Sequence, residues 1–222
     1  MTDRPASRRL VLLTGFGPFP GMPENASTRL AAELCDSALR AFPSHAFVWS
    51  PVPTEWQRAP RHLHDLYRAH EPAAAIHFGV SGRASGFEIE LCGRNRLSAI
   101  VDAAGMVPVA GALDPAGPDT LPTRLPVDRI LQRLRAHGIP AALSRDAGGY
   151  LCNALLYHAS AFGRRHDTGL RTGFIHLPAA LAKLRQQPKR PPRQSRLTWA
   201  QALRGGLLII GATLGVEPTA PR

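Results

Sequence analysis

The chain has 222 residues, of which 44% are hydrophobic and 19% charged, and its formal net charge is +11 at pH 7. This length fits one globular domain with a substantial core, and the composition excludes a disordered chain.

The charge first suggests an anionic partner, but arginine is spread along the whole chain and is concentrated only at 185–196. That segment has no aromatic side chain on which bases could stack, so we expect a flexible basic loop at 185–197 and no nucleic-acid partner. A contact with a phosphate or a protein partner stays the alternative for this segment.

Short apolar runs alternate with amphipathic patterns along the chain. The predicted strands are residues 10–16, 46–53, 73–80, 87–95 and 169–178. The predicted helices are residues 27–42, 56–70, 127–138 and 198–214, with a further helix that begins near Cys152. Residues 102–126 are rich in proline and glycine and are expected to form a long loop. Alternating strands and helices predict an α/β fold, a single domain over 1–222 whose mostly parallel sheet is covered on both faces.

The three cysteines of the chain are widely spaced. They are Cys35, Cys92 and Cys152, and they form no CxxC pair, which argues against a disulfide framework and a structural zinc site. We therefore expect a reducing, cytoplasmic setting. The apolar run at 207–216 is too short to span a bilayer, so no membrane partner is expected.

Cys152 stands where two glycines, Gly148 and Gly149, lead into an apolar helix. At the start of a helix, unpaired backbone N–H groups and the helix dipole stabilise a thiolate, which makes Cys152 a candidate nucleophile. Inert packing is the alternative for a free cysteine. The glycines favour a reactive thiol, because they permit a strained turn that exposes it.

His176 lies near the end of the strand predicted at 169–178, and in this fold class sites gather at the carboxyl ends of strands. It could take a proton from a thiol if the two side chains meet, or it could be structural. Glu88 and Glu90 share one face of the predicted strand at 87–95, and either carboxylate could orient the imidazole. A solvated acidic edge is the alternative for this pair.

Phe16 and Phe19 flank a proline just after the first predicted strand. The segment lacks the glycine spacing and the lysine of phosphate-binding loops. The two rings could instead form an aromatic wall for a small, flat, uncharged ligand, or they could belong to the core.

Four motifs, taken in order, resemble those of the pyroglutamyl peptidase I family, the pyrrolidone-carboxylate peptidases. They are LLTGFGPFPGMPENAST, GVSG followed by IELCGRN, DAGGYLCN and GFIHLP. In the second motif of the family the active glutamate lies five residues before an asparagine, as Glu90 does before Asn95. The resemblance runs from about residue 10 to residue 214.

The resemblance implies an α/β/α sandwich and an omega-peptidase that removes an amino-terminal pyroglutamate from peptides. It implies Cys152 as the nucleophile, His176 as general base and then acid, and Glu90 as the orienting partner, with a thioester intermediate. The residues that it implies for holding the pyrrolidone ring are Phe16, Phe19, Tyr150 and Leu151. It implies no metal or cofactor, pyroglutamyl peptides as partners, and a possible homo-oligomer.

Three positions depart from the family pattern. Glu88 stands where serine or threonine is usual, Leu91 where lysine or arginine is usual, and Ile100 where many bacterial members carry an arginine. Two alternatives stay open. Glu88 and the missing arginine suggest the same triad acting on another N-acyl or lactam substrate. The net charge of +11 and the basic segment 185–196 suggest a catalytically weak, basic binding protein on the same scaffold.

Overall fold

Six strands form one sheet, in the order β2-β1-β3-β8-β4-β7, in the computed structural model, which describes residues 8–19, 24–166, 169–183 and 195–219. The strands are β1 (Arg9–Phe16), β2 (His45–Val52), β3 (Ala74–Ser81), β4 (Phe87–Glu90), β7 (Ala141–Ser144) and β8 (Arg171–Pro178). The neighbours from β2 to β8 pair in parallel, β4 pairs antiparallel with β8, and β7 runs parallel to β4. The predicted mostly parallel sheet is therefore confirmed.

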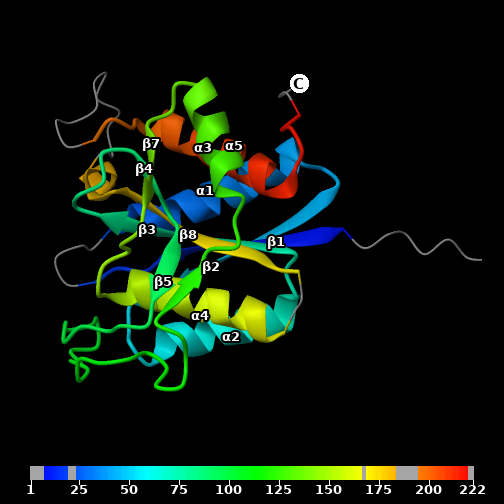
Figure 1. The fold of residues 1–222 in the computed structure, drawn as a ribbon. Helices are drawn as coiled ribbons and strands as arrows, with labels where there is room; N and C mark the ends of the chain where they lie inside the picture. Colours follow the sequence, from blue (N-terminus) through cyan, green and yellow to red (C-terminus); the bar gives the residue numbers. More distant parts are fainter. Residues whose placement is uncertain (1–7, 20–23, 167–168, 184–194, 220–222) are drawn as a thin grey trace, which may run out of the picture.

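Helices cover both faces of this sheet (Figure 1). They are α1 (Ala26–Ala41), α2 (Arg58–His70), α3 (Val127–Ala136), α4 (Leu151–Arg165) and α5 (Trp199–Leu214), with a short 3-10 helix at Ala179–Lys183. One apolar core lies between the sheet and α1, α3 and α5, and a second lies between the sheet and α2 and α4. The predicted three-layer α/β/α sandwich is confirmed.

Local signals in the sequence explain where two of these helices begin. The Asn25 side chain caps α1 by accepting a hydrogen bond from the Ser27 backbone N–H at 3.1 Å. Before α5, Thr198 and Gln201 form a reciprocal capping box. Each cap satisfies backbone donors that the first turn of a helix leaves free.

The prediction of one strand over 87–95 is wrong, because the chain leaves the main sheet after Glu90. The Leu91 N–H donates to the Ser144 carbonyl at 2.7 Å, while the Leu91 carbonyl accepts from the Thr123 N–H at 2.9 Å. The chain then forms β5 (Cys92–Arg94), which pairs antiparallel with β6 (Thr120–Pro122) in a separate ribbon.

Two further strands were not predicted. β6 lies inside the segment 102–126, expected to be a loop, and β7 lies in a stretch without β-branched residues.

Of the loop expected at 185–197, residues 185–194 lie outside the described ranges, while Ser195 and Leu197 are buried. Within the described part of the chain, every helix is too short or too polar to cross a membrane.

Candidate active site

Cys152 lies in the first turn of α4. The first backbone hydrogen bond of this helix runs from the Ala154 N–H to the Tyr150 carbonyl, at 3.2 Å. The N–H groups of residues 151–153 precede that bond, and N–H groups in this position point out of the start of a helix. Negative charge is stabilised at such a helix terminus, as expected for a thiolate or an oxyanion.

The turn before Cys152 requires both of its glycines. Gly148 has a φ of +85°, in the left-handed region that favours glycine. A Cβ atom at Gly149 would lie 2.1 Å from the Ser98 Oγ atom, and the Ser98 N–H donates to the Gly149 carbonyl at 3.0 Å. The two glycines therefore fix the entry into α4, one through its backbone conformation and the other through close approach.

Asn153, the residue after the cysteine, anchors the start of α4 to the β5 segment. Its side-chain Oδ1 accepts from the Arg94 N–H at 2.8 Å, and its Nδ2 donates to the carbonyls of Arg94 at 2.9 Å and Arg96 at 2.8 Å. The side chain is completely buried. The sequence interpretation missed this role, although a polar residue inside an apolar helix was a signal for it.

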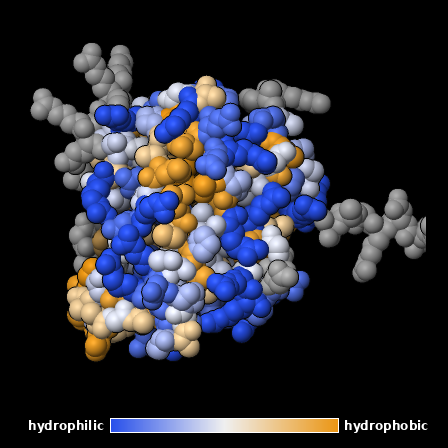
Figure 2. All heavy atoms as spheres, in the orientation of Figure 1, coloured by the Kyte–Doolittle hydropathy of each residue, from blue (hydrophilic) through white to orange (hydrophobic). Residues whose placement is uncertain are grey.

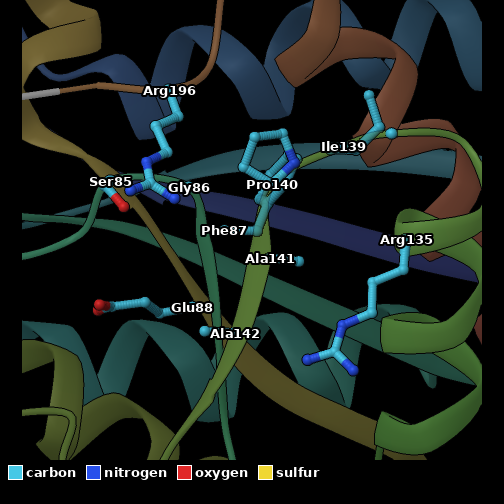
Figure 3. Close-up of a pocket in the computed structure, with 11 residues that line it drawn as sticks. Ser85, Gly86, Phe87, Glu88, Arg135, Ile139, Pro140, Ala141, Ala142 and Arg196 are labelled. Atoms are coloured by element: carbon cyan, nitrogen blue, oxygen red, sulfur yellow. The ribbon is translucent and has the colours of Figure 1, made fainter.

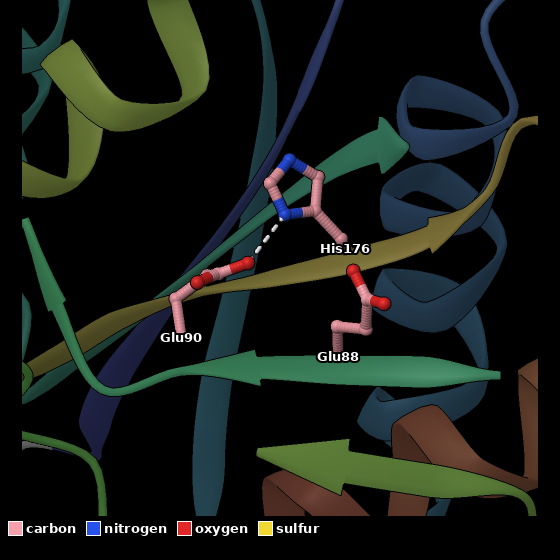
Figure 4. A group of neighbouring side chains, drawn as sticks. All are labelled: Glu88, Glu90 and His176. Carbon is pink, nitrogen blue, oxygen red and sulfur yellow. Dashed lines mark hydrogen bonds and ion pairs between the residues drawn. The ribbon is translucent and has the colours of Figure 1, made fainter. Parts of the chain in front are cut away.

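His176 lies near the end of β8 and is 5% exposed. Its Nδ1 atom is 2.7 Å from Oε1 of Glu90, which is fully buried on β4 (Figure 4). Because an ionised carboxylate only accepts, the imidazole donates this hydrogen bond through Nδ1–H. The Phe174 ring stands edge-on to the imidazole, with the ring centroids 5.0 Å apart.

Cys152 and Glu90 together determine the charge of His176. Burial alone would lower the pKa of the imidazole, but negative charge on Cys152, its hydrogen bonding and that of Glu90 raise this pKa to about 10. Gly79 lies opposite His176 in the β3–β8 pair, and a Cβ atom there would be 3.0 Å from the Cys152 Sγ atom. The missing side chain leaves room for the thiol, and the structure thus brings Cys152, His176 and Glu90 together.

Glu88, the other predicted carboxylate, lies beside His176 without a hydrogen bond to it (Figure 4). The nearest polar atoms of Glu88, Glu90 and His176 are all within 4.8 Å of one another. Within this group, Nδ1 of His176 and Oε1 of Glu90 form a hydrogen-bonded ion pair at 2.7 Å. Strand periodicity alone left both carboxylates open and the family resemblance implied Glu90, and Glu90 is the one hydrogen-bonded to the imidazole.

Aromatic side chains extend from this cluster in two groups. Phe16, buried at the end of β1, has its ring centroid 6.2 Å from that of Phe174. Phe19 lies 6.5 Å from Tyr150, and Tyr150 stands edge-on to Trp56 at 5.3 Å, again between ring centroids. The predicted residues Phe16, Phe19 and Tyr150 thus belong to two neighbouring aromatic groups.

Leu151 differs from these aromatic residues because its side chain is 1% exposed. It belongs to the apolar core between the sheet and helices α2 and α4. Its role as a pocket wall stays a prediction.

Trp56 and Asp102 organise the loop after β5, and the sequence interpretation missed both. The Trp56 N–H donates to Oδ2 of Asp102 at 2.9 Å, and its indole N–H donates to the Ile100 carbonyl at 2.8 Å. Oδ1 of Asp102 accepts from the N–H groups of Ala104 and Met106. Burial would raise the pKa of the Asp102 carboxyl, but the backbone donors outweigh it and lower that pKa. An aspartate within a proline- and glycine-rich loop was the available signal.

The outer side of this loop is apolar. Figure 2 shows hydrophobic residues gathered at the lower left of the molecule, where the loop lies in Figure 1. The exposed apolar residues of the loop are Ile100, Val101, Val107 and Val109. The loop therefore combines a hydrogen-bonded inner side, next to Trp56 and Tyr150, with an apolar surface.

An α/β sandwich in which a helix-start cysteine meets a histidine paired with a buried glutamate is typical of cysteine hydrolases. The family model for pyroglutamyl peptidase matches residues 9–210, so the chain belongs to that family. Its relatives include a pyrrolidone-carboxylate peptidase of Gloeobacter violaceus, 34% identical, with 90% of this chain and 94% of the relative aligned. Another, from Cupriavidus pinatubonensis, is 32% identical over 94% of both chains.

Solved structures agree with this assignment. The crystal structure of Bacillus amyloliquefaciens pyroglutamyl peptidase I matches with a TM-score of 0.79 and 31% identity, over 93% of this chain and 96% of that chain. A mutant pyrrolidone carboxyl peptidase from Pyrococcus furiosus matches with a TM-score of 0.81 and 26% identity, over 93% and 98% of the two chains.

Proposed function

We propose that this protein is a cysteine omega-peptidase that hydrolyses the bond after an amino-terminal pyroglutamate in peptides. The observation that carries the proposal is the 2.7 Å hydrogen bond between His176 and Glu90, beside Cys152 at the start of α4. Membership of the pyroglutamyl peptidase family supports the choice of substrate, because the relatives are named for pyrrolidone-carboxylate peptidase activity.

In the first half of the proposed reaction, the Cys152 thiolate attacks the carbonyl carbon of the pyroglutamyl residue. The carbonyl electrons move onto oxygen, where N–H groups at the start of α4 can stabilise the negative charge. The His176 imidazolium then donates a proton to the amine of the next residue as the C–N bond breaks. The products are a free peptide and a thioester on Cys152.

In the second half, His176 takes a proton from water, and the resulting hydroxide attacks the thioester. The C–S bond breaks, pyroglutamate leaves, and the thiolate is restored. Glu90 holds the imidazole in one tautomer and stabilises its charged form. The residues act only on protons, acyl carbon and sulfur, so the cycle balances with water as its one co-substrate.

We assign recognition of the lactam ring to Phe16, Phe19, Tyr150 and Leu151. A five-membered lactam is flat, neutral and compact, so aromatic walls with a few backbone hydrogen bonds can select it. The contact between the Phe19 and Tyr150 rings at 6.5 Å supports a shared aromatic surface near the cysteine.

The release of aminomethylcoumarin from a pyroglutamyl derivative under reducing conditions tests this function. We expect Cys152→Ala to lower kcat/KM by about 10³-fold or more, since the nucleophile is lost. Cys92→Ser, which changes a partly exposed thiol on β5, is the matched control and should retain the rate. Full activity in Cys152→Ala would rule out the proposed mechanism.

The charge of Glu88 beside His176 favours a second candidate, in which the same triad acts on another N-acyl or lactam substrate. Parallel assays with pyroglutamyl, N-acetylated and prolyl aminomethylcoumarins separate the two candidates. If aminomethylcoumarin is released faster from the N-acetylated or prolyl substrate than from the pyroglutamyl substrate, the second candidate is favoured.

A reducing, cytoplasmic setting belongs to the same proposal, because the nucleophile must be a free thiol; all three cysteines are free. The homo-oligomer stays a prediction, which light scattering after size-exclusion chromatography can test. We expect no nucleic-acid or membrane partner, and salt-sensitive retention on nucleic acid would instead favour the binding-protein alternative.

A further inference from the structure

Glu88 is a second carboxylate placed close to His176. It lies directly across from His176 in the antiparallel pair of β4 and β8, and residues opposite each other in such a pair present their side chains on one face. Glu90 lies two residues further along β4, on the same face. Two carboxylates therefore lie close to the imidazole (Figure 4).

The two carboxylates differ in how they reach the imidazole. Glu90 donates no proton but accepts one hydrogen bond from Nδ1–H, while its other oxygen, Oε2, is buried without a hydrogen-bond partner. Glu88 is half-buried, and its nearest polar atom is within 4.8 Å of those of Glu90 and His176. Glu88 can thus act on His176 through charge alone, without fixing its orientation.

The charged groups around Glu88 come from several elements. His176 lies on β8, Glu90 lies on β4, and Arg83 precedes β4. Arg135 and Arg196 line the same pocket as Glu88, a cavity of about 420 Å³ (Figure 3). The Glu88 carboxylate forms no salt bridge with any described residue, so none of these arginines neutralises it at contact distance.

We propose that Glu88 acts on the reaction through His176, as a second carboxylate whose charge stabilises the imidazolium form. This inference rests on the proposed function, in which His176 is the protonated partner of the Cys152 thiolate. An opposite charge within about 4–6 Å favours the charged form of a titratable group. Partial exposure of Glu88 weakens the effect through solvent and salt, so it adds to the stronger action of Glu90.

The protonation of Glu88 itself supports a pH-dependent role. Burial raises the pKa of this carboxyl, and the charge of Glu90 raises it further, whereas His176 and Arg83 oppose that change. As the pH falls, the Glu88 carboxylate is therefore protonated at a higher pH than an ordinary glutamate. Its support for the imidazolium is then lost, on the acidic side of the activity range.

The test is an NMR titration of the His176 ring in the wild type and in Glu88→Gln. We expect the amide to lower the pKa of His176 by about half a unit or more, because a nearby negative charge is removed. Glu71→Gln is the matched control. Glu71 caps the end of α2 just before β3 starts, so it lies at the amino-terminal end of β3, whereas His176 lies near the carboxyl-terminal end of the parallel strand β8. Its replacement should leave the titration of His176 unchanged.

Glu88→Asp and Glu88→Thr distinguish an effect of the Glu88 charge from a structural effect of the substitution. Aspartate keeps the charge and should restore most of the wild-type titration, whereas threonine should behave like glutamine. An unchanged pKa of His176 in folded Glu88→Gln and Glu88→Thr would overturn the proposal. So would an aspartate variant that titrates like the glutamine variant.

The pH–rate profile gives a second readout. Without the Glu88 charge, the imidazolium deprotonates more readily and the thiolate forms more readily, so both limbs of the kcat/KM profile should move to lower pH. The shift should shrink in high salt. A kcat/KM profile of Glu88→Gln whose two limbs lie at the wild-type pH would contradict the proposed role of Glu88. The titration needs no turnover, so a missing pyroglutamyl activity with a shifted His176 would refute the proposed function and leave the Glu88 inference standing.

Discussion

Two buried histidines on neighbouring strands of one sheet have opposite preferences for a proton. His77 on β3 is completely buried, and burial lowers its pKa to about 3. His176 on β8 is almost as well buried, yet its pKa is raised to about 10. The difference comes from the partners of each ring and not from the degree of burial.

The partners of His77 are neutral hydroxyl groups. Its Nδ1 atom lies 2.8 Å from Oγ1 of Thr14, and its Nε2 atom lies 2.7 Å from the Tyr67 hydroxyl and 3.2 Å from Oγ1 of Thr172. These groups satisfy a neutral imidazole but offer no charge to balance a cation. The network ties β1, β3, β8 and α2 together, so His77 is a structural residue.

The partners of His176 carry or can carry negative charge. Glu90 accepts from Nδ1–H, and the Cys152 thiol lies on the other side, at the start of α4. The same fold thus contains one buried histidine whose neutral partners tie strands together and another whose partners favour its protonated form. A buried titratable group has to be interpreted through the charge of its neighbours.

The largest expected contrast between the two histidines is in catalysis. We expect His176→Gln to lower kcat/KM by about 10³-fold, because the general base and acid are lost. His77→Gln should retain kcat within a few-fold, provided that the assay temperature keeps the variant folded. A comparable loss of kcat/KM in both variants, measured with the pyroglutamyl coumarin substrate, would contradict the distinction between a structural and a catalytic histidine.

In stability the order should be reversed. His77→Ala leaves a cavity and removes the central member of a buried network, and we expect the free energy of unfolding to fall by about 3 kcal/mol. Thr14→Val removes one hydrogen bond at nearly constant volume and should cost only about 1 kcal/mol. Urea denaturation measures both values. A His77→Ala loss no larger than that of Thr14→Val would mean that the network contributes little.

A smaller and more specific effect is expected in acid. The pKa of His77 is lower in the folded than in the unfolded protein, so the unfolded state binds the proton first as the pH falls below about 6.5. Stability should therefore fall toward pH 3, by about 1.4 kcal/mol per pH unit from this group. His77→Gln should show a shallower acid slope than the wild type. Equal slopes would indicate that His77 already carries a proton in the folded state.

His176 has the opposite linkage. Its pKa is raised in the folded protein, so its contribution to stability is present at low pH and is lost as the pH rises from about 6.5 toward 10. The two histidines therefore destabilise the fold at opposite ends of the pH range.

Much of the fold could be predicted because its strands and helices have strong local signals. The apolar run of β1 is an example, because its signal lies in residues that are consecutive in sequence. β7 could not be predicted, because Ala141–Ser144 is a strand only through its pairing with β4. The end of β4 at Glu90 likewise depends on hydrogen bonds that Leu91 makes with distant residues.

The site divides in the same way. The motifs pointed to Cys152 and His176, and the spacing of Glu90 to Asn95 pointed to Glu90, whereas strand periodicity alone left Glu88 and Glu90 equivalent, since both lie on one face of one strand. Asn153 and Asp102 each accept a hydrogen bond from a backbone N–H far away in sequence, that of Arg94 and that of Trp56. The network of His77 was invisible for the same reason, because its partners come from three other elements.

The most direct test of this account is the protonation state of the two histidine rings at pH 7. Nitrogen chemical shifts of the wild-type protein, with signals assigned through His77→Gln and His176→Gln, report whether each ring carries one proton or two. We expect His176 to be an imidazolium, protonated at both nitrogens, and His77 to be neutral. A neutral His176 at pH 7, or two rings in the same state, would contradict the account.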